Sequence, residues 1–105
     1  MKRNELIDRL KGSGRVVLLD GGMGSLLAER GWTPPSLPEE MNLDHPGTVE
    51  GIHRAYCEAG ADIIETNTFG GSALKLACRG LDSKTREINA AAARLARRSA
   101  GRGVL

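Results

Sequence analysis

Aromatic residues are almost absent from this chain. Its 105 residues include one Trp, one Tyr and one Phe, so aromatics make up 3% of the sequence. A hydrophobic core must therefore consist of Leu, Ile, Val and Ala, which commonly fill the space between a sheet and its covering helices. Hydrophobic residues reach 40% and charged residues 27%, which is typical of a folded globular chain rather than a disordered one.

Cysteine is also rare, and no long hydrophobic run occurs. The two cysteines, Cys57 and Cys78, form neither a CxxC motif nor a spacing typical of metal ligands, so we expect reduced thiols within helices. The charged residues at the N-terminus are not followed by an apolar signal segment, and no run approaches the roughly 20 residues that span a bilayer. We therefore expect a cytoplasmic protein without a membrane partner.

A strong excess of one charge is missing as well. The formal net charge is +2, which is too small to indicate a nucleic-acid partner. Arginines gather near the end of the chain, but no aromatic residues lie between them, so they are typical of a solvated helix face. These arginines are Arg86, Arg94, Arg97, Arg98 and Arg102. We expect no nucleic acid to bind.

The chain does contain two short apolar runs that end in polar residues. The first spans 16–19 and is followed by Asp20; the second spans 63–64 and is followed by Glu65. Neither run alternates with polar residues, which predicts buried strands of a parallel sheet covered on both faces. In such α/β folds the ligand site lies at the carboxyl ends of the strands. We therefore expect an α/β fold with its site at these two strand ends.

Helical periodicity surrounds the two runs. Charge patterning and apolar residues at steps of three and four predict helices at 3–10, 25–30, 46–59, 73–78 and 83–100. The right-handed crossover rule makes the two predicted strands parallel to each other.

Two residues outside the strands have more than one interpretation. Trp32 precedes a proline-rich loop and either faces a substrate or packs as a plug against the core. His53 lies off the apolar stripe of its predicted helix and has no second metal-ligating side chain at helical spacing. We therefore expect His53 at the surface or at its boundary.

The residues that follow the two strands carry the capacity to bind a ligand. Asp20 and Glu65 are expected on one rim, where they bind a cationic amine or act as acid and base; alternatively, one or both cap a neighbouring helix. Hydroxyl and amide groups follow Glu65 at Thr66, Asn67 and Thr68. This rim favours an amino-acid-like ligand, but it does not define a reaction.

The glycines after Asp20 do not form a nucleotide-binding motif. Gly22 and Gly24 would need a third glycine at position 27, which is Leu27, and no P-loop sequence is present. Glycines at this place instead allow a close approach of the backbone to a ligand, and the amides that follow open a helix where an anion can bind.

Four stretches resemble the homocysteine-binding domain of homocysteine S-methyltransferases, as in the N-terminal module of cobalamin-dependent methionine synthase. They are LDGGMGS at 19–25, PEEMNL at 38–43, IHRAY at 52–56 and EAGADIIETNTFG at 58–70. The resemblance extends from about residue 15 to residue 105. The DGGMG and ETNTFG motifs in this order make it specific.

The resemblance implies a fold larger than this chain. The family fold is a (β/α)8 TIM barrel, which needs roughly 250 residues. We therefore expect an N-terminal fragment of such a barrel, with strands one and two, their helices, and the start of strand three at Val104 and Leu105. Residues 1–14 would form an N-terminal cap helix and linker, and residues 15–105 the partial barrel domain.

The resemblance also implies an activity. Family members transfer a methyl group to the sulfur of homocysteine to form methionine, and a zinc ion holds that sulfur as a thiolate. The three cysteine ligands of the zinc would lie beyond Leu105, because neither Cys57 nor Cys78 matches them. The full-length protein would use one of three methyl donors: methyltetrahydrofolate, S-methylmethionine or betaine. With methyltetrahydrofolate, cobalamin would serve as the methyl carrier. We expect no metal ligand and no catalytic residue in this chain, which alone would be inactive.

Binding roles follow from the resemblance residue by residue. Asp20 receives the amino group of homocysteine, and Thr66 helps to hold its amino-acid end. The neighbouring glycines shape the pocket, the residues after Thr66 complete the rim, and Glu65 has the least defined role. The implied substrate-binding residues are Asp20, Gly21, Gly22, Glu65, Thr66, Asn67, Thr68 and Phe69.

A second function class stays open on the residues alone. In that alternative the chain is a small non-catalytic α/β module that binds an amino acid or an anionic metabolite at its strand tips. It requires 105 residues that fold cooperatively. Two parallel strands with exposed edges make a poor isolated domain, so we expect the isolated chain to be marginally stable or to aggregate.

Overall fold

Helices dominate the computed structural model, which describes residues 1–12, 15–101 and 103–105. All five predicted helices form, with ends that differ from the predicted ones by a few residues. Three short elements that were not predicted are added: η1, α3 and η2. In chain order the elements are α1 (Arg3–Leu10), α2 (Gly24–Glu29), η1 (Pro38–Glu40), α3 (Met41–Asp44), α4 (Pro46–Glu58), α5 (Ala73–Ala77), η2 (Asp82–Lys84) and α6 (Thr85–Ala100).

The two predicted strands are present as extended segments joined by a single parallel bridge. Leu19 pairs with Ile63. The amide of Asp20 donates to the Ile63 carbonyl at 3.0 Å, and the amide of Ile63 donates to the Leu18 carbonyl at 3.2 Å. The predicted parallel direction is therefore confirmed. The prediction of regular strands is not, because one bridge does not make a ladder, and no strand forms among the described residues.

A third extended segment pairs with the second. The Leu105 amide donates to the Asp62 carbonyl at 3.0 Å, and the Leu105 carbonyl accepts from the Ile64 amide at 2.8 Å. This exchange has the pattern of a parallel pair, so Leu105 flanks Ile63 on the side opposite Leu19. The order of the segments in space thus follows their order in the chain.

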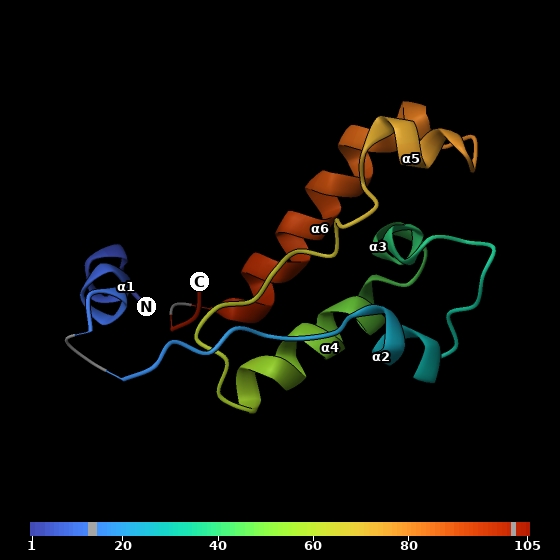
Figure 1. The fold of residues 1–105 in the computed structure, drawn as a ribbon. Helices are drawn as coiled ribbons and strands as arrows, with labels where there is room; N and C mark the ends of the chain where they lie inside the picture. Colours follow the sequence, from blue (N-terminus) through green and yellow to red (C-terminus); the bar gives the residue numbers. More distant parts are fainter. Residues whose placement is uncertain (13–14, 102) are drawn as a thin grey trace.

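The core lies behind the extended segments, where α4 and α6 pack against each other (Figure 1). One cluster of buried side chains joins four helices. A smaller cluster couples Ile64 to the C-terminal half of α6 through Ala96 and Ala100. The larger cluster, which joins the four helices, consists of Leu27, Met41, Val49, Ile52 and Leu95. As the composition predicted, aliphatic side chains build this core.

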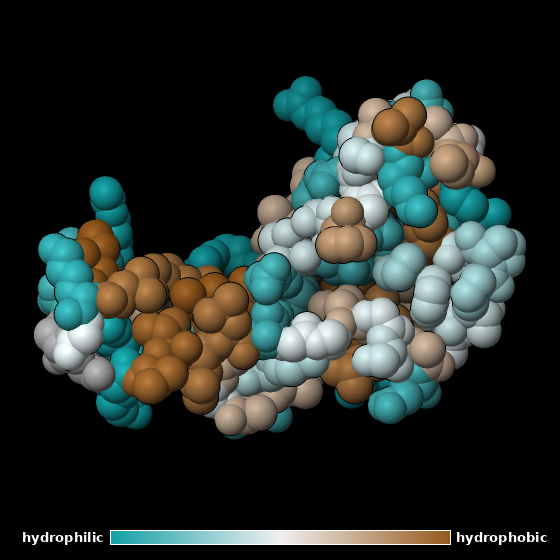
Figure 2. All heavy atoms as spheres, viewed as in Figure 1, coloured by the Kyte–Doolittle hydropathy of each residue, from teal (hydrophilic) through white to brown (hydrophobic). Residues whose placement is uncertain are grey.

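The opposite face of the extended segments is open. Val16 is 79% exposed and Leu19 is 56% exposed, so the prediction of a strand buried on both faces is wrong. Figure 2 shows apolar side chains gathered on this part of the surface. Only one layer of helices covers the segments within the described residues, and a strand is buried on both faces only when a second layer is present.

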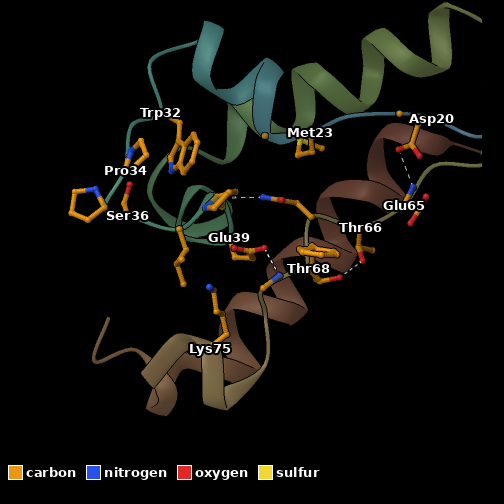
Figure 3. Close-up of a pocket in the computed structure, with 18 residues that line it drawn as sticks. Asp20, Met23, Trp32, Pro34, Ser36, Glu39, Glu65, Thr66, Thr68 and Lys75 are labelled. Carbon is orange, nitrogen blue, oxygen red and sulfur yellow. Dashed lines mark hydrogen bonds between the residues drawn. The ribbon is translucent and has the colours of Figure 1, made fainter. Parts of the chain in front are cut away.

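Helix α1 attaches at the amino ends of the extended segments. Arg9 forms an ion pair with Asp62 at 3.1 Å, and the other carboxylate oxygen of Asp62 accepts from the Leu18 amide at 3.1 Å. The Leu18 amide and the Arg9 guanidinium together hold the pKa of Asp62 below its ordinary value. The helix therefore lies at the end of the segments away from Asp20 and Glu65 (Figures 1 and 3).

His53 corrects another expectation from the sequence. Its side chain is 0% exposed, so the predicted surface or boundary position is wrong. Helix α4 contacts both α2 and α6, which makes its buried face wider than the stripe of apolar residues alone. Burial lowers the pKa of His53, and the negative charges of Asp20 and Glu50 act in the opposite direction.

No helix among residues 1–12, 15–101 and 103–105 is long and apolar enough to cross a membrane.

Candidate functional site

A pocket of about 670 Å³ opens at the carboxyl ends of the extended segments. Its lining residues lie within 20–24, 32–39 and 65–70 and include Lys75 of α5 (Figure 3). Asp20 and Glu65 lie at one end, the loop from Trp32 to Glu39 forms the wall opposite, and Lys75 reaches in from α5. The structure thus brings together most of the residues that the sequence predicted for binding.

Asp20 ties the two segment ends together. Its Oδ2 accepts a hydrogen bond from the Glu65 amide at 3.0 Å. Its Oδ1 is buried and has no hydrogen-bond partner among the described residues. A carboxylate accepts several hydrogen bonds, so this oxygen keeps capacity for a ligand that donates one. Asp20 does not cap a helix through its side chain, because its recorded partner is the amide of Glu65.

The threonines form a polar strip beside Asp20. The hydroxyls of Thr66 and Thr68 lie 2.7 Å apart, and the Thr68 amide donates to the Thr66 carbonyl at 2.9 Å. Phe69 is fully exposed at the rim and Glu65 is exposed as well. All four residues line the pocket, as predicted, with hydroxyl, carboxylate and aromatic groups.

Asn67 lies in the same stretch but is buried, and its amide group is bonded within the protein. The Asn67 Nδ2 donates to Asn42 Oδ1 at 2.9 Å and to the Pro38 carbonyl at 3.0 Å. In return, Asn42 Nδ2 donates to the Asn67 carbonyl at 2.9 Å. The structure therefore places Asn67 in the wall of the pocket with its donors directed to the protein.

The glycines after Asp20 allow a close contact with α4. A Cβ on Gly21 would lie 3.2 Å from the hydroxyl of Tyr56, and that hydroxyl donates to the Gly22 carbonyl at 2.6 Å. Gly21 lines the pocket, whereas Gly22 is outside the lining residues. Tyr56 therefore accounts for a small residue at position 21, whereas a Cβ on Gly22 would lie 3.2 Å from the hydroxyl of Ser25.

Trp32 packs as predicted for a plug against the core, and the interpretation that it faces a substrate stays a prediction. Its side chain packs against the core cluster that contains Leu27 and Met41, and it also lines the pocket. Its indole Nε1 is buried without a hydrogen-bond partner among the described residues.

Glu39 is a site residue that the analysis of strand ends missed. It lines the pocket and is 2% exposed, and its Oε1 accepts from the Gly70 amide at 2.6 Å. The sequence signal was the PEEMNL stretch, which contributed only to the resemblance. Its neighbour Glu40 accepts from the Leu37 amide at 2.6 Å and from Arg79 at 3.1 Å. Burial favours a higher pKa for Glu40, but these two donors outweigh it and hold its pKa below the ordinary value.

No metal site is built by this part of the protein. Among the residues that the structure describes, no cluster of three or more His, Cys, Asp or Glu side chains could hold a metal ion. Cys57 on α4 is partly buried, and burial raises the pKa of its thiol; Cys78 is exposed, and both are free. The described residues therefore do not fit a zinc ion.

Comparison with known proteins gives consistent matches. Residues 17–104 match the family model described as homocysteine S-methyltransferase. The chain is 36% identical over 100 residues to the S-methylmethionine–homocysteine S-methyltransferase of Pongo abelii, covering 93% of this chain and 26% of the relative. It is 38% identical over 106 residues to the betaine–homocysteine S-methyltransferase 1 of Danio rerio, covering 93% and 25%.

A third relative and a solved structure agree with these matches. The methionine synthase of Mycobacterium leprae is 37% identical over 92 residues, which cover 82% of this chain and 8% of the relative. The crystal structure of the homocysteine methyltransferase MmuM from Escherichia coli, in its metallated form, superposes with a TM-score of 0.77 at 26% identity, covering 89% of this chain and 33% of that chain. The chain thus spans about a quarter of its first two curated relatives and a third of the solved one. Because the family model matches most of its length, the chain belongs to the homocysteine S-methyltransferase family.

Proposed function

We propose that this chain supplies part of the homocysteine site of a homocysteine S-methyltransferase, an enzyme that transfers a methyl group to the sulfur of homocysteine to form methionine. The observation that carries this proposal is Asp20. Its Oδ1 is buried and has no hydrogen-bond partner among the described residues. Asp20 itself lies at the end of a pocket that Thr66 and Thr68 line with hydroxyl groups. An ammonium group is a suitable donor for that oxygen.

The proposed architecture is a partial (β/α)8 barrel that comprises residues 15–105, with residues 1–14 as an N-terminal helix and linker. Three extended segments pair in parallel and in chain order, and α4 lies between the first two along the chain, with α6 before the third. This repeated alternation is the pattern of a barrel, in which binding residues follow the carboxyl ends of the strands. The solved neighbour supports the same arrangement over 89% of this chain.

The residues of this chain would bind and orient homocysteine. Asp20 would accept hydrogen bonds from the ammonium group. Because the hydroxyls of Thr66 and Thr68 are bonded to each other, one of them would donate to the substrate carboxylate while the other donates to its partner. Glu65 and Phe69 would complete the rim at the mouth of the pocket. Fixing the amino-acid end in this way leaves the sulfur directed away from the rim, where a methyl donor must approach.

Activation of the sulfur is not attributed to these residues. Zinc would hold the homocysteine thiolate through cysteine ligands outside this chain, and cobalamin would serve as methyl carrier if the donor is methyltetrahydrofolate. Betaine and S-methylmethionine are the donors named for two relatives. We propose a cytoplasmic location for the enzyme, and no activity for the 105-residue chain alone.

The test is binding of L-homocysteine by isothermal titration calorimetry to the full-length protein and to its Asp20→Asn variant. Loss of the carboxylate charge should weaken binding at least tenfold, because a charge-assisted hydrogen bond to the ammonium group is lost (about 1.5–3 kcal/mol). Asp82→Asn is the matched control, since Asp82 is exposed on η2 and outside the pocket. Equal affinity of the wild type and the Asp20→Asn variant would contradict the proposal.

A further inference from the structure

The segment that carries the hydroxyls of Thr66 and Thr68 is hydrogen-bonded to side chains to which the proposed function gives no role. Along the segment from Thr66 to Gly71, the hydroxyls that line the pocket belong to Thr66 and Thr68. The anchoring contacts fall on other positions, namely Asn67, Gly70 and Gly71. Within this short segment, the residues whose hydroxyls line the pocket are thus different from the residues that are hydrogen-bonded to the rest of the protein.

Glu39 provides the anchor closest to the rim. Its Oε1 accepts from the Gly70 amide at 2.6 Å, shorter than the usual range for this type of bond. The carboxyl group is 2% exposed, and its Oε2 is buried without a hydrogen-bond partner among the described residues. Burial of an incompletely bonded carboxyl group is unfavourable for folding, so a contribution to stability does not explain Glu39.

The contact between Glu39 and Gly70 is also sterically close. A Cβ at position 70 would lie 3.2 Å from each of the two carboxyl oxygens of Glu39 and 3.3 Å from its Cδ. A side chain at position 70 would therefore displace either the carboxyl group or the rim. The contact between Glu39 and the backbone at position 70 therefore depends on the absence of a side chain there.

Two further anchors hold the same segment from other elements. Asn42 on α3 exchanges hydrogen bonds with Asn67, and Asn89 on α6 donates to the Gly71 carbonyl at 2.8 Å. These bonds hold the segment on both sides of the Gly70 amide. Together with Asn42 and Asn89, Glu39 thus holds the backbone of the segment that carries Thr66 and Thr68.

We propose that Glu39 is a positioning residue of the homocysteine site: by accepting the Gly70 amide, it fixes Thr66 and Thr68 in the geometry that binds the amino-acid end of the substrate. This inference rests on the proposed function. It assigns Glu39 an effect on substrate affinity through the backbone, without contact to the substrate.

The test compares homocysteine affinity, by calorimetry, in full-length variants at position 39. Glu39→Leu removes the acceptor while keeping much of the shape, and it should weaken binding at least tenfold. Glu39→Gln keeps a carbonyl oxygen for the Gly70 amide and should bind within about threefold of the wild type. Arg79→Ala is the matched control, because it removes an ion pair to the neighbouring Glu40 and should leave the affinity unchanged.

A double-mutant cycle shows whether Glu39 acts through Gly70. Gly70→Ala alone should weaken binding, and it should add little to Glu39→Leu, since both changes disrupt the same contact. Additive losses would overturn the mechanism. If Glu39→Leu does not fold, Gly70→Ala and Glu39→Gln decide the question, and wild-type affinity of Gly70→Ala or a tenfold loss in Glu39→Gln would overturn the proposal.

The outcomes separate this inference from the function on which it rests. If Asp20→Asn loses affinity and a folded Glu39→Leu keeps it, only the positioning role of Glu39 is overturned. If the wild-type protein does not bind homocysteine at all, both proposals are overturned.

Discussion

The two ends of the paired extended segments are built in opposite ways. At the carboxyl end, Asp20 accepts a hydrogen bond from the Glu65 amide, and the rim from Thr66 to Gly71 is held by hydrogen bonds to side chains of η1, α3 and α6. Along the first segment before Asp20, apolar side chains such as Val16 and Leu19 are exposed, and at the amino end one ion pair between Arg9 and Asp62 attaches α1. The described part of this chain therefore contains the contacts that hold the pocket residues in place. It contains no layer that covers the exposed apolar side chains of the extended segments, called the apolar face below.

The largest expected difference between covered and open regions concerns the core. Ile52 is fully buried in the main cluster, and Ile52→Ala should lower the free energy of unfolding by roughly 2–5 kcal/mol. In the isolated 105-residue chain, Leu19→Ala, on the open face, should change it by no more than about 0.5 kcal/mol. Urea denaturation followed by circular dichroism measures both. Equal losses for the two variants would show that the apolar face is covered in solution.

A smaller effect is expected from the polar support of the rim. Asn42→Ala leaves the buried amide of Asn67 with one partner fewer, which should cost about 1–3 kcal/mol in the same denaturation measurement. Ser36→Ala, which removes a hydroxyl bonded to the exposed Thr33 carbonyl, is the control and should cost less. A loss at Asn42 no larger than at Ser36 would mean that the reciprocal amide pair does not fix the rim.

The smallest effect is a pH dependence that arises from His53. Burial lowers its pKa in the folded state below the ordinary value of 6.5, so the unfolded chain takes up the proton first as the pH falls. Stability should therefore decrease below about pH 6.5, with a slope of at most about 1.4 kcal/mol per pH unit, until the folded-state pKa is reached.

Paired histidine variants isolate that contribution. Denaturation between pH 7.5 and pH 5, as a rough window around the reference pKa, should lose this slope in His53→Leu and keep it in His45→Gln, because His45 is exposed. An unchanged slope in His53→Leu would assign the pH dependence to other groups.

The sequence predicted the helices well because their signals are local. Pro46 at the start of α4 and the small apolar stripe of α6 lie within the elements that they define. The direction of the extended segments was also correct, since it follows from a general rule on crossover connections. Asp20 and Thr66 line the pocket, where polar residues at strand ends were expected, and their role in binding stays a prediction.

The errors all concern contacts between distant residues. The burial predicted for Val16 and Leu19 requires a second layer, which composition does not reveal. His53 was placed outside because only apolar residues were counted as buried. Glu39 was missed as a site residue because its role depends on Gly70, which lies 31 positions later in the chain. Long-range proximity of this kind has no signature in a local sequence pattern.

The most direct test of the central claim is a crystal structure of the full-length protein with L-homocysteine. We expect the ammonium nitrogen within hydrogen-bond distance of the Asp20 carboxylate, about 2.7–3.1 Å, with the substrate carboxylate beside Thr66 and Thr68. Homocysteine bound with its ammonium group away from Asp20, or outside this pocket, would contradict it.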